Sequence, residues 1–74
     1  MLPMIDMEET GKNITMLRKR NNLTVRQLQD VFGFSTPQAI YKWQNGSTLP
    51  MVDNLLVLAM LFHVSIEDIL AVKK

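Results

Sequence analysis

Four side chains that can hydrogen-bond outward fall on one side of a short segment near the middle of the chain. At about 100° per residue, the residues that fall together on this helical face are Gln38, Tyr41, Lys42 and Asn45. Gln and Asn amides can form two hydrogen bonds with adenine, and Lys can reach guanine acceptors or phosphates. Thr36, Ile40 and Trp43 fall on the opposite side, which we expect to be buried. The pattern indicates a surface suited to nucleobase edges.

Other chemistries have few candidates in this sequence. It has no cysteine and a single histidine, His63, so thiol catalysis and cysteine- or histidine-rich metal sites are excluded. No nucleophile–base pair is apparent. We therefore expect neither an enzyme nor a bound metal or cofactor.

Length and composition predict one small globular domain. The 74 residues are 47% hydrophobic and 20% charged. The longest apolar run, 55–62, is far shorter than the roughly 20 residues that span a bilayer. The N-terminus lacks the features of a secretory signal, so we expect a cytoplasmic protein.

The net charge of +1 hides an uneven distribution. Residues 11–46 contain six basic residues and one acidic residue, whereas both flanking segments are acidic overall. Such a basic middle is typical of a surface that faces a polyanion. A solvated charged face is the alternative on charge alone.

Capping signals divide the chain into five expected helices. Their expected ranges, caps included, are 6–20, 24–33, 36–44, 51–62 and 65–70. Capping-box spacing occurs at Asp6 and Glu9, at Thr24 and Gln27, and at Ser65 and Asp68. For the third helix, Thr36 is the expected cap and Pro37 the expected first residue. Gly11 lies inside the first helix, which predicts that another backbone comes close to it.

The third helix follows a short turn after the second, an arrangement suited to insertion into a DNA major groove. The run from Lys12 to Leu70 resembles the xenobiotic-response-element family of bacterial helix-turn-helix regulators, which are relatives of the Cro and lambda repressors. The matching pieces are Asn13-Ile14 with Leu17-Arg18, Leu23-Thr24 with Leu28, Phe32-Gly33-Phe34-Ser35, Ala39-Ile40-Tyr41-Lys42-Trp43 with Gly46, Leu49-Pro50 with Asp53-Asn54-Leu55, and Val64-Ser65 with Asp68-Ile69-Leu70.

This resemblance implies a fold and a set of domain limits. The expected fold is all-α, a compact five-helix bundle of the Cro and lambda-repressor kind containing a helix-turn-helix. Residues 1–9 would form an N-terminal arm and the start of the first helix, residues 10–71 the DNA-binding domain, and residues 72–74 a C-terminal tail.

The resemblance also implies the residues that would contact double-stranded DNA. The base-reading positions are Pro37, Gln38, Tyr41 and Lys42. The backbone-contacting positions are Thr24, Val25, Asn45 and Ser47, to which Arg26 is added because a cation near a helix N-terminus is unfavourable without an external partner.

Two departures from the family pattern affect these expectations. The interval from Gly33 to Ile40 is one residue longer than usual, which shifts the start of the third helix. In addition, Gln44 stands where the family often has Glu, so Arg18 of the first helix would have a neutral acceptor in place of a carboxylate.

The fourth helix is rich in leucine and nearly apolar all round. It either lies fully buried or leaves an apolar strip for a homodimer. The expected dimer residues are Val57, Met60, Leu61 and Val64. The function expected is a repressor-like transcription regulator that binds an inverted repeat as a homodimer. The alternative is an antitoxin or another protein-interaction module with the same fold.

Overall fold

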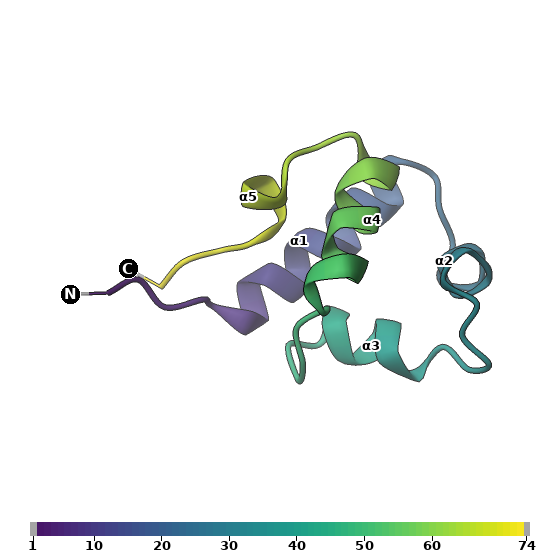
Figure 1. The fold of residues 1–74 in the computed structure, drawn as a ribbon, viewed down its shortest axis with the longest axis horizontal. Helices are drawn as coiled ribbons and strands as arrows, with labels where there is room; N and C mark the ends of the chain where they lie inside the picture. Colours follow the sequence, from purple (N-terminus) through teal and green to yellow (C-terminus); the bar gives the residue numbers. More distant parts are fainter. Residues whose placement is uncertain (1, 74) are drawn as a thin grey trace.

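Five helices account for most of residues 2–73, the part of the chain that this computed structural model describes (Figure 1). They are α1 (Met7–Arg20), α2 (Val25–Phe32), α3 (Gln38–Gln44), α4 (Val52–Phe62) and α5 (Ile66–Ile69). The predicted all-α, five-helix architecture is confirmed. The limits of α1, α2 and α5 lie close to the predicted ones because side-chain caps at Asp6, Thr24 and Ser65 set where these helices begin.

The N-terminus of α1 shows only half of its expected capping box. The Asp6 side chain accepts a hydrogen bond from the Glu9 backbone N–H at 3.0 Å. The Glu9 carboxylate does not return to Asp6 but accepts from Lys12 Nζ at 3.2 Å. The Lys12 ammonium, about one turn further along the helix, therefore donates to Glu9 in place of the Asp6 backbone N–H.

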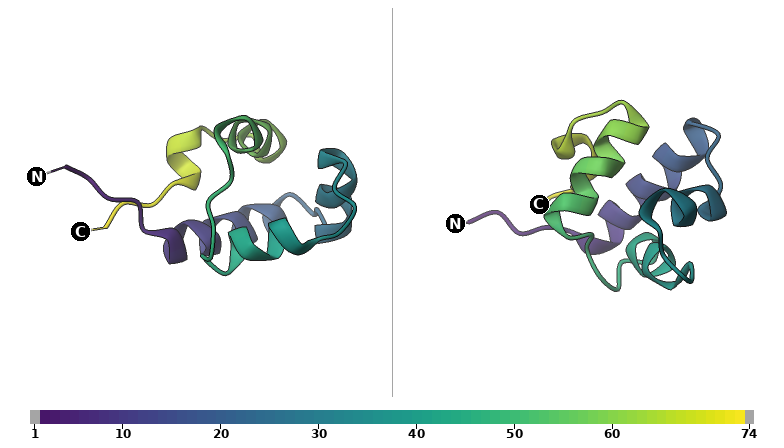
Figure 2. Two further views of the ribbon diagram at one scale, coloured as in Figure 1. Left: turned by 60° about the horizontal axis from the view of Figure 1, so that its bottom comes forward. Right: turned by 45° about the vertical axis from the view of Figure 1, so that its right-hand side comes forward.

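α1 packs against the C-terminal end of α3, and Gly11 makes this contact possible (Figure 2). A Cβ atom on Gly11 would lie 2.5 Å from the Gln44 carbonyl oxygen and 2.6 Å from that of Trp43. The close backbone approach predicted from this glycine is confirmed. Its physical reason is that any side chain at position 11 would push the two helices apart.

An aromatic cluster supports the turn between α2 and α3. The rings of Phe32 and Phe34 are stacked with centroids 5.3 Å apart. Trp43 of α3 meets both edge-on, at 5.4 and 5.9 Å. Between the two phenylalanines, Gly33 ends α2 in the left-handed conformation with φ of 69°. The cluster thus joins the end of α2, the turn and the inner side of α3.

Two expectations for the start of α3 are wrong. Pro37 is the N-cap and not the first helical residue, and α3 begins at Gln38 without a side-chain cap. Thr36 is exposed and lies outside the helix, so it is neither the cap nor part of the buried side. The longer turn explains both differences, because it delays the helix and extends the chain before it.

α4 and α5 complete the core. The fully or almost fully buried apolar residues are Ile14, Leu17, Leu28, Ile40, Trp43, Leu55, Leu58, Ala59, Phe62 and Ile69. α5 has the full capping box predicted at Ser65 and Asp68. Within residues 2–73, every helix is too short or too polar to cross a membrane.

The two ends of the described chain lie side by side (Figure 1). Ile5 and Val72 form an antiparallel bridge, flanked by hydrogen bonds from Asp6 N to Ala71 O and from Lys73 N to Met4 O, both 2.8 Å. The segments expected as arm and tail therefore pair with each other. Residues 1 and 74 of those segments lie outside the described residues.

Candidate nucleic-acid interface

The outer side of α3 is polar and exposed to solvent. Gln38, Tyr41 and Lys42 are all exposed, and Tyr41 retains 48% of its accessible surface. Ile40 and Trp43, at 0% and 4%, lie on the inner side. Among the described residues, no hydrogen bond joins any of the three outer side chains to another protein group. They are free to form hydrogen bonds with an external partner.

The inner side of α3 is held by a half-buried arginine from α1. Arg18 Nε donates to Gln44 Oε1 at 2.9 Å, and one of its terminal nitrogens donates to the Leu23 carbonyl at 2.8 Å. The predicted neutral acceptor for Arg18 is confirmed. The guanidinium links α1, the end of α3 and the residue that precedes the cap of α2, so it fixes the orientation of one helix relative to the other.

The N-terminus of α2 offers backbone donors. The predicted box is complete, since Thr24 Oγ1 accepts from Gln27 N at 3.0 Å and Gln27 Oε1 accepts from Thr24 N at 2.8 Å. The N–H groups of Val25 and Arg26 belong to the first turn and have no acceptor within the helix. Such a helix end suits a phosphate, given the positive end of the helix dipole.

Arg26 itself lies fully on the surface. Its guanidinium is 3.4 Å from the Asp30 carboxylate, and both side chains are mostly exposed, at 79% and 68%. An ion pair in water contributes little stability. Arg26 can therefore leave this partner for a phosphate at low cost.

The loop after α3 holds Asn45 and Ser47 together. Asn45 Oδ1 accepts from the Ser47 backbone N–H at 2.9 Å and also from the Ser47 hydroxyl. The acceptor of Asn45 is thus used within the protein, which leaves its amide N–H groups as donors. Pro37, at the other end of α3, has no polar side-chain group and is half-buried.

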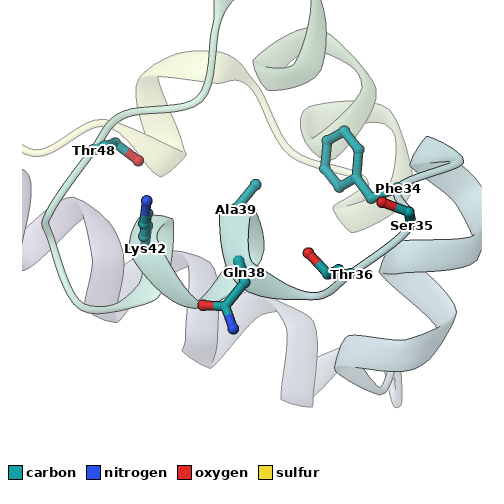
Figure 3. A pocket seen from close by; sticks show the side chains of 7 residues that line it. All are labelled: Phe34, Ser35, Thr36, Gln38, Ala39, Lys42 and Thr48. Atoms are coloured by element: carbon teal, nitrogen blue, oxygen red, sulfur yellow. The ribbon is translucent and has the colours of Figure 1, made fainter.

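A hollow of about 350 Å³ lies along α3, and sequence analysis did not anticipate it (Figure 3). We call it the turn–loop hollow. Its polar lining residues are Ser35, Thr36, Gln38, Lys42 and Thr48. The available signal was the hydroxyl residues that flank α3 in the sequence, Ser35 and Thr36 before it and Thr48 after it.

The four predicted dimer residues are not exposed to the same extent. Met60 is exposed at 69%, Val57 is half-buried, and Leu61 and Val64 pack against the core. Met60 and three residues that were not predicted form the outward apolar side of α4 and of the residue before it, which we call the α4 strip. They are Met51, Val52, Leu56 and Met60, with exposures of 73%, 79%, 53% and 69%.

Comparisons with known proteins identify the family. A helix-turn-helix family profile matches residues 14–69. Two solved structures have the same fold, one of the DNA-binding domain of BldD and one of the S. venezulae BldD DNA-binding domain. Each has a TM-score of 0.72 and 17% identity over 88% of this chain, and the match covers 93% and 96% of the two domains respectively. A search of curated proteins gave no match. The chain belongs to the helix-turn-helix family, in its xenobiotic-response-element type.

Proposed function

We propose that this protein is a sequence-specific, repressor-like transcription regulator that places α3 in the major groove of double-stranded DNA. The observation that carries the proposal is the outer side of α3, where Gln38, Tyr41 and Lys42 are exposed and lack protein partners. A helix with such groups, held from behind by buried packing, suits direct contact with base edges.

Two kinds of contact bind the DNA, one to base edges and one to phosphates. Base edges are read from α3, with the Gln38 amide matched to adenine and the Tyr41 ring and hydroxyl beside it. Phosphates are bound by the first turn of α2 at Val25 and Arg26 and by the loop residues Asn45 and Ser47, which fix the register on the duplex. Regulation follows from occupancy of the operator, without a catalytic step.

Selection of bound duplexes from a random pool, followed by titrations at two salt concentrations, tests the proposal. Gln38→Ala should remove the preference at one base pair, a loss of about 1–3 kcal/mol of discrimination. Arg26→Ala is the control, because a lost phosphate contact weakens all sequences alike. If Gln38→Ala leaves the selected motif unchanged, Gln38 is not a base-reading residue.

We further propose that the protein acts as a homodimer on an inverted repeat, with the α4 strip as the seam. The strip is apolar, and spacing of four residues between Val52, Leu56 and Met60 places these side chains along one side of the helix. The largest apolar patch of a typical monomer covers roughly 300–600 Å², whereas a stable interface needs roughly 800 Å² per partner. We therefore expect a weak dimer in solution that is completed on DNA.

Cysteine cross-linking tests this seam, since the chain has no cysteine of its own. Leu56→Cys should form disulfide-linked dimers on mild oxidation, and more of them with the inverted repeat present. Val31→Cys is the matched control, because Val31 on α2 is also 53% exposed. Equal cross-linking of both variants, or of neither, would contradict the seam.

The α4 strip also favours a second candidate, an antitoxin or other protein-interaction module. In that case the strip would bind a different chain and DNA affinity would be secondary. The candidate predicts a monomer by size exclusion at high concentration, a larger complex in cell extract, and weak binding to every duplex. Tight binding of the isolated protein to a selected inverted repeat would rule against it.

A further inference from the structure

The hydroxyl groups of this chain divide into two sets. Among the eight serines and threonines, five form side-chain hydrogen bonds within the protein. These are Thr10, Thr15, Thr24, Ser47 and Ser65. In the described part of the chain, Ser35, Thr36 and Thr48 form none, and all three line the turn–loop hollow.

The free polar groups of the hollow converge from three segments (Figure 3). The hydroxyls of Ser35 and Thr36 point into it from the turn before α3, and the hydroxyl of Thr48 points into it from the loop after α3. The Lys42 ammonium extends from the helix toward Thr48, whereas the Gln38 amide points away from both Lys42 and Thr48. Gln38 and Lys42 therefore face different surroundings although both lie on α3.

The chemistry of the hollow fits an oxyanion. Its lining contains one cation, Lys42, and no carboxylate. An ammonium supplies up to three donors and each hydroxyl supplies one. Phosphate oxygens accept such bonds, and an ammonium bound to an oxyanion forms a stronger hydrogen bond than a neutral donor. Ala39, at the base of the hollow, brings no competing polar group.

The position of the hollow identifies the source of the oxyanion. It runs along the flank of α3, between the turn that precedes the helix and the loop that follows it. When a helix lies in the major groove, the sugar–phosphate backbone borders it on both sides. We propose that the turn–loop hollow binds a backbone phosphate of one DNA strand, with Lys42 as its charged ligand in place of a base-reading role. This inference rests on the proposed function.

Neutral backbone substitutions test the assignment directly. Methylphosphonates, which remove the charge of single phosphates, are placed one by one along the selected operator half-site. The wild-type protein should lose about tenfold in affinity at one phosphate, or at two neighbouring ones. Lys42→Met should bind the unmodified duplex about tenfold more weakly, show no further loss at that phosphate, and lower the salt slope by about 1. Its base preference should stay unchanged.

Matched variants separate the hollow from general charge loss. Lys12→Met removes a lysine from α1, away from the hollow, and should change neither the affinity nor the methylphosphonate pattern. Thr48→Val keeps the shape and removes one donor, so it should reduce the loss at the same phosphate. Lys42 and Thr48 are exposed, so thermal unfolding of these variants should match that of the wild type.

Three results would overturn the inference. The first is that Lys42→Met alters the preference at one base pair while the methylphosphonate pattern stays complete, which makes Lys42 a base reader. The second is that inorganic phosphate alone binds the hollow tightly while no backbone substitution matters, which assigns it to a free phosphate compound. The third is that the wild-type protein retains no duplex at low salt, which overturns the proposed function as well.

Discussion

The two sides of α3 differ in whether their side chains have partners within the protein. The inner side is filled, since the α1 backbone meets it at Gly11, Arg18 donates to Gln44, and Trp43 packs edge-on against two stacked phenylalanine rings. The outer side carries polar groups without protein partners. The difference indicates that the orientation of α3 is set by contacts within the protein, and that the outer groups are available for the DNA contacts proposed above. Substitutions on the two sides should therefore affect different measurements.

The largest effect is expected on the inner side, from Gly11→Ala. Its Cβ would lie 2.5 Å from a backbone oxygen that cannot rotate away. We expect a loss of about 3 kcal/mol in the free energy of unfolding, after the gain in helix propensity. The melting temperature should fall by more than about 10 °C.

Gly33→Ala is the control for that prediction. Gly33 has a left-handed backbone conformation, with φ of 69°, but a Cβ atom there would meet no other atom within 4 Å. Its cost should be limited to about 1 kcal/mol of backbone strain. Equal losses of stability in Gly11→Ala and Gly33→Ala would show that the close α1–α3 contact is not the cause of the Gly11→Ala loss.

The next effect is expected on the outer side, from Tyr41→Ala. This side chain is half exposed and touches no described hydrogen-bond partner. Unfolding should change by less than about 0.5 kcal/mol, while affinity for the selected operator should fall about tenfold. Tyr41→Phe separates the ring from the hydroxyl. A stability loss that matches the affinity loss would remove the distinction between the two sides.

A smaller effect, of opposite sign, is expected from Gln44→Glu. The new carboxylate would accept a charge-assisted hydrogen bond from Arg18, whose Nε is 2.9 Å from the present oxygen. We expect a gain of about 0.5–1 kcal/mol at pH 7. Because the partner lowers the pKa of the new carboxyl, the gain should be present above pH of about 4 and disappear as the pH falls further. A gain that persists in acid would point to a cause other than charge.

The smallest effect concerns Lys12, an exposed residue in the N-terminal half of α1. The hydrogen bond that the Lys12 ammonium donates to Glu9, together with the nearby charges of Glu9 and Glu8, raises the pKa of Lys12 above its ordinary value of 10.5. A group whose pKa is higher in the folded state than in the unfolded state stabilises the protein at any pH below its unfolded-state pKa. This stabilisation is lost as the pH rises through the folded-state pKa. The wild-type protein should therefore lose a little stability as the pH rises from 9 to 11, whereas Lys12→Met should lack this loss. Thermal unfolding across this pH range measures the difference.

Local signals predicted much of this architecture. The boxes at Thr24 and Ser65 and the glycine at position 33 mark helix ends because caps depend on residues only three or four apart. The phase of α3 followed from the positions of Ile40 and Trp43. Gly11 predicted a close contact, although its partner on α3 could not be known before the chain was folded.

Other features depend on tertiary packing and escaped prediction. α4 is apolar nearly all round, so its sequence has no phase to show that Leu56 faces outward while Leu55 is buried. Thr36 was expected inside because the helical period was extended into a turn. The hollow beside α3 joins Thr36 to Thr48 across twelve residues, a proximity that local patterns do not encode.

The pairing of Ile5 with Val72 has a practical consequence. Both ends of the described chain emerge together, on the side of the molecule remote from α2 (Figure 1). A fluorescent protein fused to either terminus should leave α2 and α3 uncovered. The same juxtaposition suits a circularly permuted variant, in which a short glycine-rich connection joins the termini and new ends are opened in an exposed loop.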